Sequence, residues 1–355
     1  MSDGREQVDA STAAFHELLT TVNTAWEEML ERTPPVILQL RIAETNVEVA
    51  LVGERLAEIL LPGLAWHAAA TGPPVATVGA WDAEATGVAL PAPLDHSDPP
   101  ALRWVARQDG RPMAGIDWSY PGMVRMGNRY AGRHLLGVSS SDVLETWEAG
   151  APLRRQLWWA LGPDVLFAHA GAVGSPDGAA LIMGASGSGK STTSLACLQA
   201  GMGFISDDYC LVRGDPPVVH LLAATARVHE HELVHLPELA KWSQRVGQAV
   251  PKALLYLHES VPDRLVQSAP VRVVLLPELT DERIPQLIAV PPAKALRLVA
   301  PAALWQMHVD PGRELEQLRR LLTAVPTYRL LLSPEREANP MAIQEVLTRA
   351  TSHSG

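Results

Sequence analysis

Residues 184–192 have the sequence Gly184-Ala185-Ser186-Gly187-Ser188-Gly189-Lys190-Ser191-Thr192, and this stretch decides the fold. Its first eight residues match the phosphate-binding loop pattern G-x-x-x-x-G-K-[ST] at every required position. The apolar residues 179–183 before it predict a buried strand, and residues 192–200 after it predict a helix that ends at Gly201. Glycines let backbone N–H groups approach phosphates, and a helix N-terminus favours negative charge. The stretch therefore predicts a triphosphate site, in which Lys190 contacts the β- and γ-phosphates and Ser191 holds Mg²⁺.

The composition of the 355-residue chain is that of a globular protein with sizeable cores. Hydrophobic residues make up 47% and charged residues 19%, and the length favours two domains over one. The net charge of −10 gives no basic surface for nucleic acid or anionic membranes, so we expect neither as a partner. We find no signal-peptide pattern and no apolar run of membrane-spanning length. Cys197 and Cys210, the only cysteines, lie in apolar segments, which is typical of a reduced, cytoplasmic protein.

The patterns along the chain place a domain boundary near residue 139. Residues 1–138 predict an N-terminal α+β domain for recognition or assembly, and residues 139–355 predict an α/β P-loop catalytic domain that holds every chemical motif. We therefore expect a fragment from about Ser139 onward to keep the nucleotide site, unless strands near 102–126 belong to the catalytic sheet. The expected elements are a helix over 11–31, strands over 36–42 and 47–52, a helix over 54–61, a loop over about 71–100 with brief strand-like pieces such as 75–78, short strands near 102–107, 112–117 and 123–126, and a long helix over 139–159 that Gly150 and Pro152 must interrupt or kink.

A strand that ends in paired carboxylates follows the phosphate loop and its helix. It covers residues 203–206 and ends in Asp207 and Asp208. In a parallel α/β sheet, the short crossover places these carboxylates at the carboxyl end of a strand near the loop. One Asp there can bind Mg²⁺, while the other orients or deprotonates an attacking hydroxyl. Adjacent side chains on a strand point in opposite directions, so a turn must redirect at least one of them. The alternative interpretation is a solvated Asp-Asp turn without a chemical role.

His169 lies in the apolar, small-residue stretch 167–173. This stretch predicts a strand that turns through residues 175–178 into the strand before the phosphate loop. A single histidine on an apolar strand is more often a hydrogen-bonded core residue than a catalyst. The pattern alone leaves both interpretations open.

In their order along the chain, these motifs resemble the catalytic domain of HPr kinase/phosphorylase, and more closely the HPr-kinase-like proteins of unassigned substrate. That family has a His followed by small residues, a phosphate loop, and a strand ending in Asp-Asp, as at 169–171, 184–191 and 207–208 here. The resemblance covers about residues 151–347 and implies a fold related to the nucleotide-binding domain of phosphoenolpyruvate carboxykinase. Further matching segments are Pro152-Leu153-Arg154-Arg155, the Pro-Asp-Arg-Leu-Val of 262–266 and the Val-Pro-x-Tyr of 325–328.

The resemblance implies a phosphotransferase, a kinase that uses ATP and Mg²⁺ to phosphorylate a hydroxyl, typically of serine, in a protein or peptide acceptor. Asp207 or Asp208 would be the general base, and the other would assist the metal, for which Ser191 and Asp208 are the candidate ligands. His169 would lie beside them as a charge or positioning residue. Relatives commonly form oligomers, so a homo-oligomer is also implied.

The family pattern also implies an arginine that stabilises the transferring phosphoryl group. The candidates are Arg227, in Thr-Ala-Arg, and Arg264, in Pro-Asp-Arg, and we prefer Arg264. The alternative for each is a surface arginine without a role.

Three departures separate the chain from HPr kinases proper. Thr192 stands where they have an acidic residue after the loop serine, and no clear copy of their glycine-rich segment follows the Asp pair. The N-terminal domain does not match theirs either. We therefore expect an acceptor other than HPr, such as a precursor peptide. The departures also argue against the reverse reaction, phosphorolysis.

The segment His231-Glu232-Leu233-Val234-His235 matches H-E-x-x-H, which on a helix binds Zn²⁺ through two histidines and uses the Glu as base. Pro237 would end such a helix just after the second histidine, and no pattern requires the candidate third ligand Glu259. A zinc metalloprotease is therefore the less favoured enzyme hypothesis. A non-catalytic, ATP-binding regulatory protein is the other alternative, which the Asp pair and His169 disfavour because a sensor needs no base.

Overall fold

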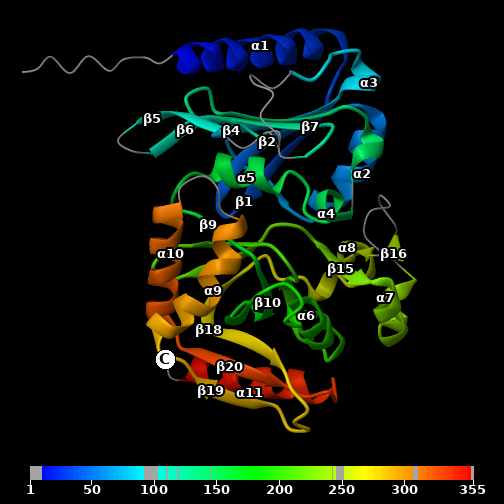
Figure 1. Cartoon of the computed structure of the whole chain (residues 1–355). Coiled ribbons are helices and arrows are strands. Elements are labelled where there is room, and N and C mark those ends of the chain that lie inside the picture. The colour runs from blue at the N-terminus through cyan, green and yellow to red at the C-terminus, as the bar shows by residue number, and fades with distance from the viewer. Residues whose placement is uncertain are drawn as a thin grey trace, which may run out of the picture.

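The computed structural model describes residues 10–91, 103–108, 111–117, 120–144, 146–241, 243–244, 252–306 and 311–352. Within them the chain is a mixed α/β protein with an eight-stranded, a nine-stranded and a three-stranded sheet. Figure 1 shows the eight-stranded sheet stacked on the other two, with short helices between the layers. None of the helices in these ranges has the length and apolar character that a membrane crossing requires.

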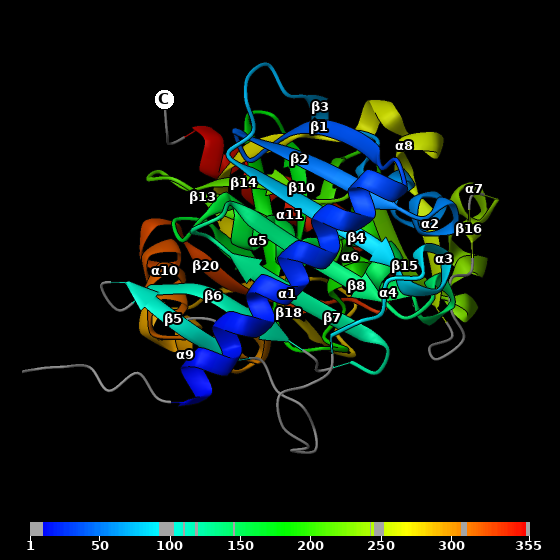
Figure 2. The ribbon, with the colours of Figure 1, turned by 90° about the horizontal axis from the view of Figure 1, so that it is seen from above.

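The N-terminal half forms the eight-stranded sheet and its helices. Its elements are α1 (Ala10–Arg32), β1 (Val36–Ile42), β2 (Thr45–Val52), α2 (Glu54–Leu64), β3 (Ala68–Ala69), β4 (Ala76–Asp82), α3 (Ala83–Thr86), β5 (Arg103–Gln108), β6 (Arg111–Asp117), β7 (Met123–Asn128) and β8 (Arg133–Val138). The strand order is β3-β1-β2-β4-β8-β7-β6-β5, and the central strands β2, β4 and β8 pair in parallel. Figure 2 shows α1 lying across one face of this sheet, where Val22, Trp26 and Met29 are buried.

The three short strands expected near 102–126 are β5, β6 and β7, and they belong to this N-terminal sheet. They therefore do not extend the sheet that carries the phosphate loop. The expected helix over 11–31 and strands over 36–42 and 47–52 are confirmed by α1, β1 and β2.

The helix expected over 139–159 is interrupted where Gly150 and Pro152 indicate, and it is not one long helix. Three short elements replace it, namely η1 (Ser141–Val143), α4 (Thr146–Ala149) and α5 (Arg154–Leu161). Pro152 cannot donate a helical hydrogen bond, and Leu153 has a left-handed φ of 54°. Pro152 also packs so closely on Gly63 of α2 that a Cβ there would lie 2.6 Å from its Cγ. Tertiary packing thus holds the break and fixes the start of α5.

The C-terminal half forms the remaining two sheets. Its elements are β9 (Leu166–Ala168), β10 (Ala170–Ser175), β11 (Gly178–Met183), α6 (Lys190–Gln199), β12 (Gly203–Ser206), β13 (Cys210–Arg213), β14 (Val218–Leu221), β15 (Thr225–His229), η2 (Glu230–His235), α7 (Pro237–Ala240), β16 (Ser243–Gln244), β17 (Lys252–Tyr256), α8 (Leu257–Ser260), η3 (Pro262–Arg264), β18 (Ser268–Leu279), β19 (Gln286–Ala289), α9 (Pro292–Gln306), α10 (Pro311–Ala324), β20 (Thr327–Leu332) and α11 (Ala338–Ser352). The large sheet has the order β12-β10-β11-β18-β14-β13-β9, with β20 beside β18 and β19 beside β20. The small sheet has the order β15-β17-β16.

One hydrophobic core joins the two halves. It combines side chains of β2, α2 and α5 with Phe167 of β9, Leu211 of β13 and Leu254 of β17, all of them buried. A backbone hydrogen bond also crosses between the halves, because the N–H of Ala224 donates to the carbonyl oxygen of Gly63 at 3.2 Å. The N-terminal sheet is therefore part of the support of the C-terminal one.

Candidate active site

The phosphate-loop pattern lies between the end of β11 and the start of α6, as the sequence predicts. Gly187 and Gly189 have φ values of +80° and +98°, in the left-handed region that favours glycine. Lys190 Nζ donates to the carbonyl oxygens of Gly184 at 2.8 Å and Ala185 at 3.0 Å, so its ammonium group lies over the loop. The loop therefore has the glycine turns and the lysine that a phosphate cradle needs.

Sheet topology brings the Asp pair to this loop. Strand β10 lies between β11 and β12 and is antiparallel to both, so β11 and β12 run in the same direction. The phosphate loop follows β11, and Asp207 and Asp208 follow β12, so both lie at the same edge of the sheet. The Ser191 hydroxyl donates to the backbone carbonyl of Asp207 at 3.3 Å, which ties the two segments together.

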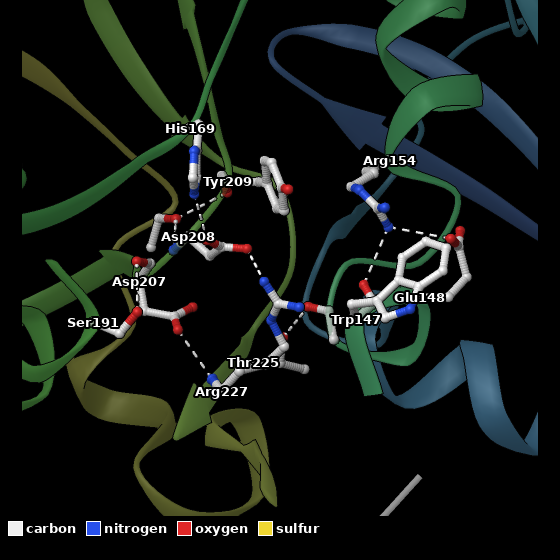
Figure 3. Close-up of polar contacts among 12 residues, drawn as sticks. Trp147, Glu148, Arg154, His169, Ser191, Asp207, Asp208, Tyr209, Thr225 and Arg227 are labelled. Carbon is white, nitrogen blue, oxygen red and sulfur yellow. Dashed lines mark hydrogen bonds and ion pairs between the residues drawn. The ribbon is translucent and has the colours of Figure 1, made fainter. Parts of the chain in front are cut away.

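The two aspartates have different partners (Figure 3). Asp208 Oδ1 lies 2.9 Å from His169 Nε2, and its Oδ2 accepts a hydrogen bond from the guanidinium of Arg227. Asp207 Oδ2 instead accepts from the backbone N–H of Arg227 at 3.0 Å. The turn that separates them is held by Ser206, whose Oγ accepts from the N–H of Asp208 at 3.2 Å. This is the redirection that two adjacent strand side chains require.

His169 is a partner of Asp208 rather than a core histidine with both nitrogens satisfied. Its ring stacks on Tyr209, with 5.3 Å between centroids. Its Nδ1 is buried and has no hydrogen-bond partner in the part of the chain that the structure describes. The histidine therefore has one nitrogen on Asp208 and the other without a protein partner.

Their environments shift the pKa values of Asp207 and Asp208 in opposite directions. Burial raises the pKa of Asp207, and the negative charge of Asp208 raises it further. Burial also disfavours the charged form of Asp208, but Arg227, His169 and Lys190 outweigh it and hold the pKa of Asp208 below its usual range. Asp208 is therefore a carboxylate throughout the neutral pH range, while Asp207 is the more readily protonated of the pair.

A cavity of about 530 Å³ opens above the phosphate loop. Its wall includes His169, Lys190, Ser191, Asp208 and Arg227, and of the two aspartates only Asp208 lines it. The Ser191 hydroxyl and the Asp208 carboxylate are oxygen donors, the kind of ligand that Mg²⁺ prefers. The residues present therefore fit a magnesium nucleotide.

The two candidate arginines lie in different places. Arg264, the preferred candidate, is at the end of η3, where its Nη1 donates to the carbonyl oxygen of Gly201 beyond the end of α6. Arg227 lies on β15, lines the cavity and is paired with Asp208. Of the two candidates, Arg227 is therefore the one that lines the cavity.

The H-E-x-x-H segment does not form the helix that a zinc site needs. It lies in η2, a 3₁₀ helix with three residues per turn, so His231 and His235 do not share a face as they would in an α-helix. Glu232 is paired with Arg336 instead. In the ranges that the structure describes, no group of three or more His, Cys, Asp or Glu side chains is placed to hold a metal ion.

Two further residues belong to this neighbourhood. Lys252, the first residue of β17, lines the same cavity, and only the pairing of β17 with β15 brings it there. Arg154 lies with its guanidinium 5.2 Å from the ring centre of Tyr209, the residue after Asp208. No motif surrounds Lys252, whereas the Pro-Leu-Arg-Arg segment of the family resemblance is the sequence signal for Arg154.

Neither a family model nor a curated protein matches the chain. Among solved structures, the chain is similar to the Hpr(Ser) kinase/phosphatase from Coxiella burnetii, with a TM-score of 0.31 and 12% sequence identity. That similarity covers 53% of this chain and 99% of the other.

Proposed function

We propose that the chain is an ATP-dependent kinase that transfers the γ-phosphoryl group to a hydroxyl in a protein or peptide acceptor, with serine as the favoured residue. The observation that carries this proposal is that Lys190, Ser191, Asp208 and Arg227 line one cavity. Phosphoryl transfer uses four such groups: a loop lysine, a hydroxyl for Mg²⁺, a carboxylate for the acceptor and an arginine for the transferring group. On the order of these motifs, we place residues 139–355 with the HPr-kinase and phosphoenolpyruvate-carboxykinase type of P-loop domain.

The chain's own groups supply most of the proposed reaction. Lys190 and the backbone N–H groups of the loop bind the β- and γ-phosphates. Mg²⁺ on Ser191, with Asp208 as a candidate second ligand, would neutralise phosphate charge. Asp208 orients the acceptor hydroxyl and takes its proton as the new oxygen–phosphorus bond forms. The bond from the γ-phosphorus to the bridging oxygen breaks, and ADP leaves with that electron pair. Arg227 stabilises the negative charge of the transferring group.

Asp207 acts in this proposal as a positioning residue. Its carboxylate accepts a hydrogen bond from the backbone N–H of Arg227. This bond holds the start of β15 where the Arg227 side chain reaches Asp208. His169 supports Asp208 from the other side and keeps its carboxylate charged.

We also propose a division of labour between the halves. Every residue on the cavity wall lies at or after position 169, so residues 139–355 would perform the chemistry. Residues 1–138 would recognise the acceptor or build a homo-oligomer, in a cytoplasmic protein without a nucleic-acid or membrane partner.

The test is MgATP turnover by the purified chain with water as the acceptor, followed as ADP release. We expect slow release that Lys190→Ala and Asp208→Asn abolish and that Arg264→Met leaves unchanged. Comparison of the phosphoproteome with and without the gene would then identify the acceptor. Tight MgATP binding with neither ADP release nor a changed phosphoprotein would favour the regulatory hypothesis instead. Stoichiometric zinc in the purified protein would favour the protease.

A further inference from the structure

Three arginines with little exposed surface are linked by shared carboxylates, and one of them, Arg154, lies over the ring of Tyr209. They are Arg125 of β7 and Arg154 and Arg155 of α5, and we call them the arginine cluster. Their side chains are only 1%, 7% and 14% exposed. Two carboxylates, Asp117 and Glu148, pair with them and are themselves fully buried. Among the described residues, three positive charges thus meet two negative ones.

The excess positive charge is only partly offset from the nucleotide side. Asp208 also acts electrostatically on Arg154, but its carboxylate is already paired with Arg227. Burial of an unpaired charge costs several kcal/mol in general, so a purely structural ion-pair network would be expected to balance. Among the described residues the cluster thus carries one positive charge in excess, which favours binding of an anion.

The cluster also holds hydrogen-bond donors that are not used. Arg154 makes its hydrogen bonds through Nη1, to the carbonyl of Trp147 at 3.1 Å and to Glu148 at 3.2 Å. Arg155 likewise uses Nη1, for Asp117. The hydrogen bonds of Arg154 and Arg155 to described residues thus all go through Nη1, and Nη1 of Arg125 is buried without a hydrogen bond. A guanidinium presents five N–H donors in a planar arrangement that matches an oxyanion. Arg154 and Arg155 therefore have further donors with which to bind one.

The position of the cluster suits an acceptor. Arg154 is sandwiched between Trp147, at 4.7 Å, and Tyr209, at 5.2 Å from the guanidinium carbon to each ring centre. Figure 3 shows Tyr209 between Asp208 and Arg154, with the Arg154 guanidinium turned toward Glu148 and Trp147. Leu153, directly before Arg154, has a left-handed φ of 54° and is fully buried. Such strain in a non-glycine residue persists only where the surroundings enforce it, and it is typical of functional sites.

We propose that the arginine cluster binds an oxyanion of the acceptor, a carboxylate or a phosphate carried close to the hydroxyl that receives the phosphoryl group. The proposal rests on the kinase function above, and it narrows the acceptor class to hydroxyl compounds or peptides with an adjacent negative group. Arg154 and Arg155 hold the oxyanion, and Tyr209 forms the wall between it and Asp208.

Binding of inorganic phosphate tests the cluster without requiring any turnover. The full chain is first saturated with Mg²⁺ and a non-hydrolysable ATP analogue, so that the phosphate loop is filled, and phosphate is then titrated by calorimetry. We expect one phosphate site per chain, weakened about tenfold or more in Arg154→Met, because each lost charge-assisted hydrogen bond is worth about a decade in affinity. Arg155→Gln, at a more exposed position, serves if Arg154→Met does not fold. Arg264→Met is the matched control and keeps wild-type affinity.

The outcomes separate this proposal from the kinase proposal. No phosphate binding, or equal affinity in wild type and the folded cluster variants, overturns the anion site whether or not ADP is released. Phosphate bound in Lys190→Ala without nucleotide, and lost when Arg154→Met is added, supports it even if no turnover is found. Succinate that displaces the phosphate supports a carboxylate-bearing acceptor, and phosphate that succinate does not displace supports a phosphorylated one.

Discussion

In each half of the molecule, a strand with a parallel neighbour is followed by a helix, and a glycine with positive φ stands directly before that helix. The connection is Gly53 alone in the N-terminal half and the six-residue loop 184–189 in the C-terminal half, and the two helices begin with opposite charges. In the N-terminal half, β2 leads through Gly53, with φ +122°, into Glu54 of α2. In the C-terminal half, β11 leads through Gly189, with φ +98°, into Lys190 of α6. Neither helix has a side chain that caps its first turn. A carboxylate complements the positive end of the helix dipole, whereas an ammonium group there adds to it. The positive end of α2 is therefore complemented by a carboxylate of the chain, whereas the start of α6 favours an anion from outside it.

The largest expected effect comes from separating the halves. Removal of residues 1–138 strips β2 and α2 from Phe167, Leu211 and Leu254, and burial of each such side chain is worth about 1.5–3 kcal/mol. The sum is comparable with the whole stability of a typical domain, ~5–15 kcal/mol. We therefore expect fragment 139–355 not to fold cooperatively, against the expectation from motif placement alone. Circular dichroism with urea unfolding measures this. A fragment that unfolds cooperatively and binds MgATP would show that residues 139–355 form an independent domain.

The second effect concerns catalysis in the C-terminal half. Asp208→Asn should lower phosphoryl transfer or ADP release by ~10²–10⁴, the range for loss of a positioned base, while MgATP affinity stays nearly unchanged. Asp207→Asn is the matched control, and we expect a smaller loss because Asp207 does not line the cavity. Rates are measured across a Mg²⁺ titration. Activity of Asp208→Asn that returns at high Mg²⁺ would identify a metal ligand, and a wild-type rate would remove Asp208 from the chemistry.

The third effect contrasts the two helix starts directly. Lys190→Ala should weaken MgATP binding by about two orders of magnitude, since it removes charge-assisted hydrogen bonds worth about 1.5–3 kcal/mol each. Glu54→Gln, the matched change at the start of α2, should leave MgATP affinity unchanged and cost about 0.3–1 kcal/mol of stability. Calorimetry gives the affinities and urea unfolding the stabilities. Equal MgATP affinity in wild type and Lys190→Ala would contradict the proposal that the start of α6, unlike that of α2, binds nucleotide.

The smallest effect separates the two aspartates by pH. The pKa of Asp207 is raised by burial, so its contribution to stability is present below the usual aspartate value of about 3.9 and is lost as pH rises through the raised value. The pKa of Asp208 is lowered, so its contribution is present above about 3.9 and is lost as pH falls through the lowered value. Relative to wild type, Asp207→Asn should thus gain stability with rising pH and Asp208→Asn should lose it, each on the order of 1 kcal/mol. Urea unfolding at several pH values measures both slopes, and parallel slopes would contradict the assignment.

The parts of the fold that depend on local signals were predictable. The residues around the phosphate loop combine a glycine turn, an apolar strand and a helix, and β11 and α6 lie within two residues of the expected bounds. The hairpin through residues 175–178 was predictable for the same reason, since turn residues separate two apolar runs. The approach of the Asp pair to the loop followed from the short crossover between α6 and β12.

The remaining features depend on contacts between distant segments. The break before α5 is held by Gly63 and by Thr225, whose hydroxyl donates to the Gly150 carbonyl. Arg227 meets Asp208 because β15 is anchored by β17 and by Asp207, which no pattern around Arg227 indicates. The parallel centre of the N-terminal sheet needs crossovers whose order local patterns do not encode.

The core shared between the halves also matters during synthesis on a ribosome. The N-terminal sheet emerges first, but the face that carries α2 and α5 gains its last apolar partners only when Leu211, Leu222 and Leu254 have been translated. Until then, a long nascent chain presents uncovered hydrophobic surface. Because the final partners come from the segment just beyond the phosphate loop, the nascent protein completes its assembly only after its nucleotide-binding part has left the exit tunnel.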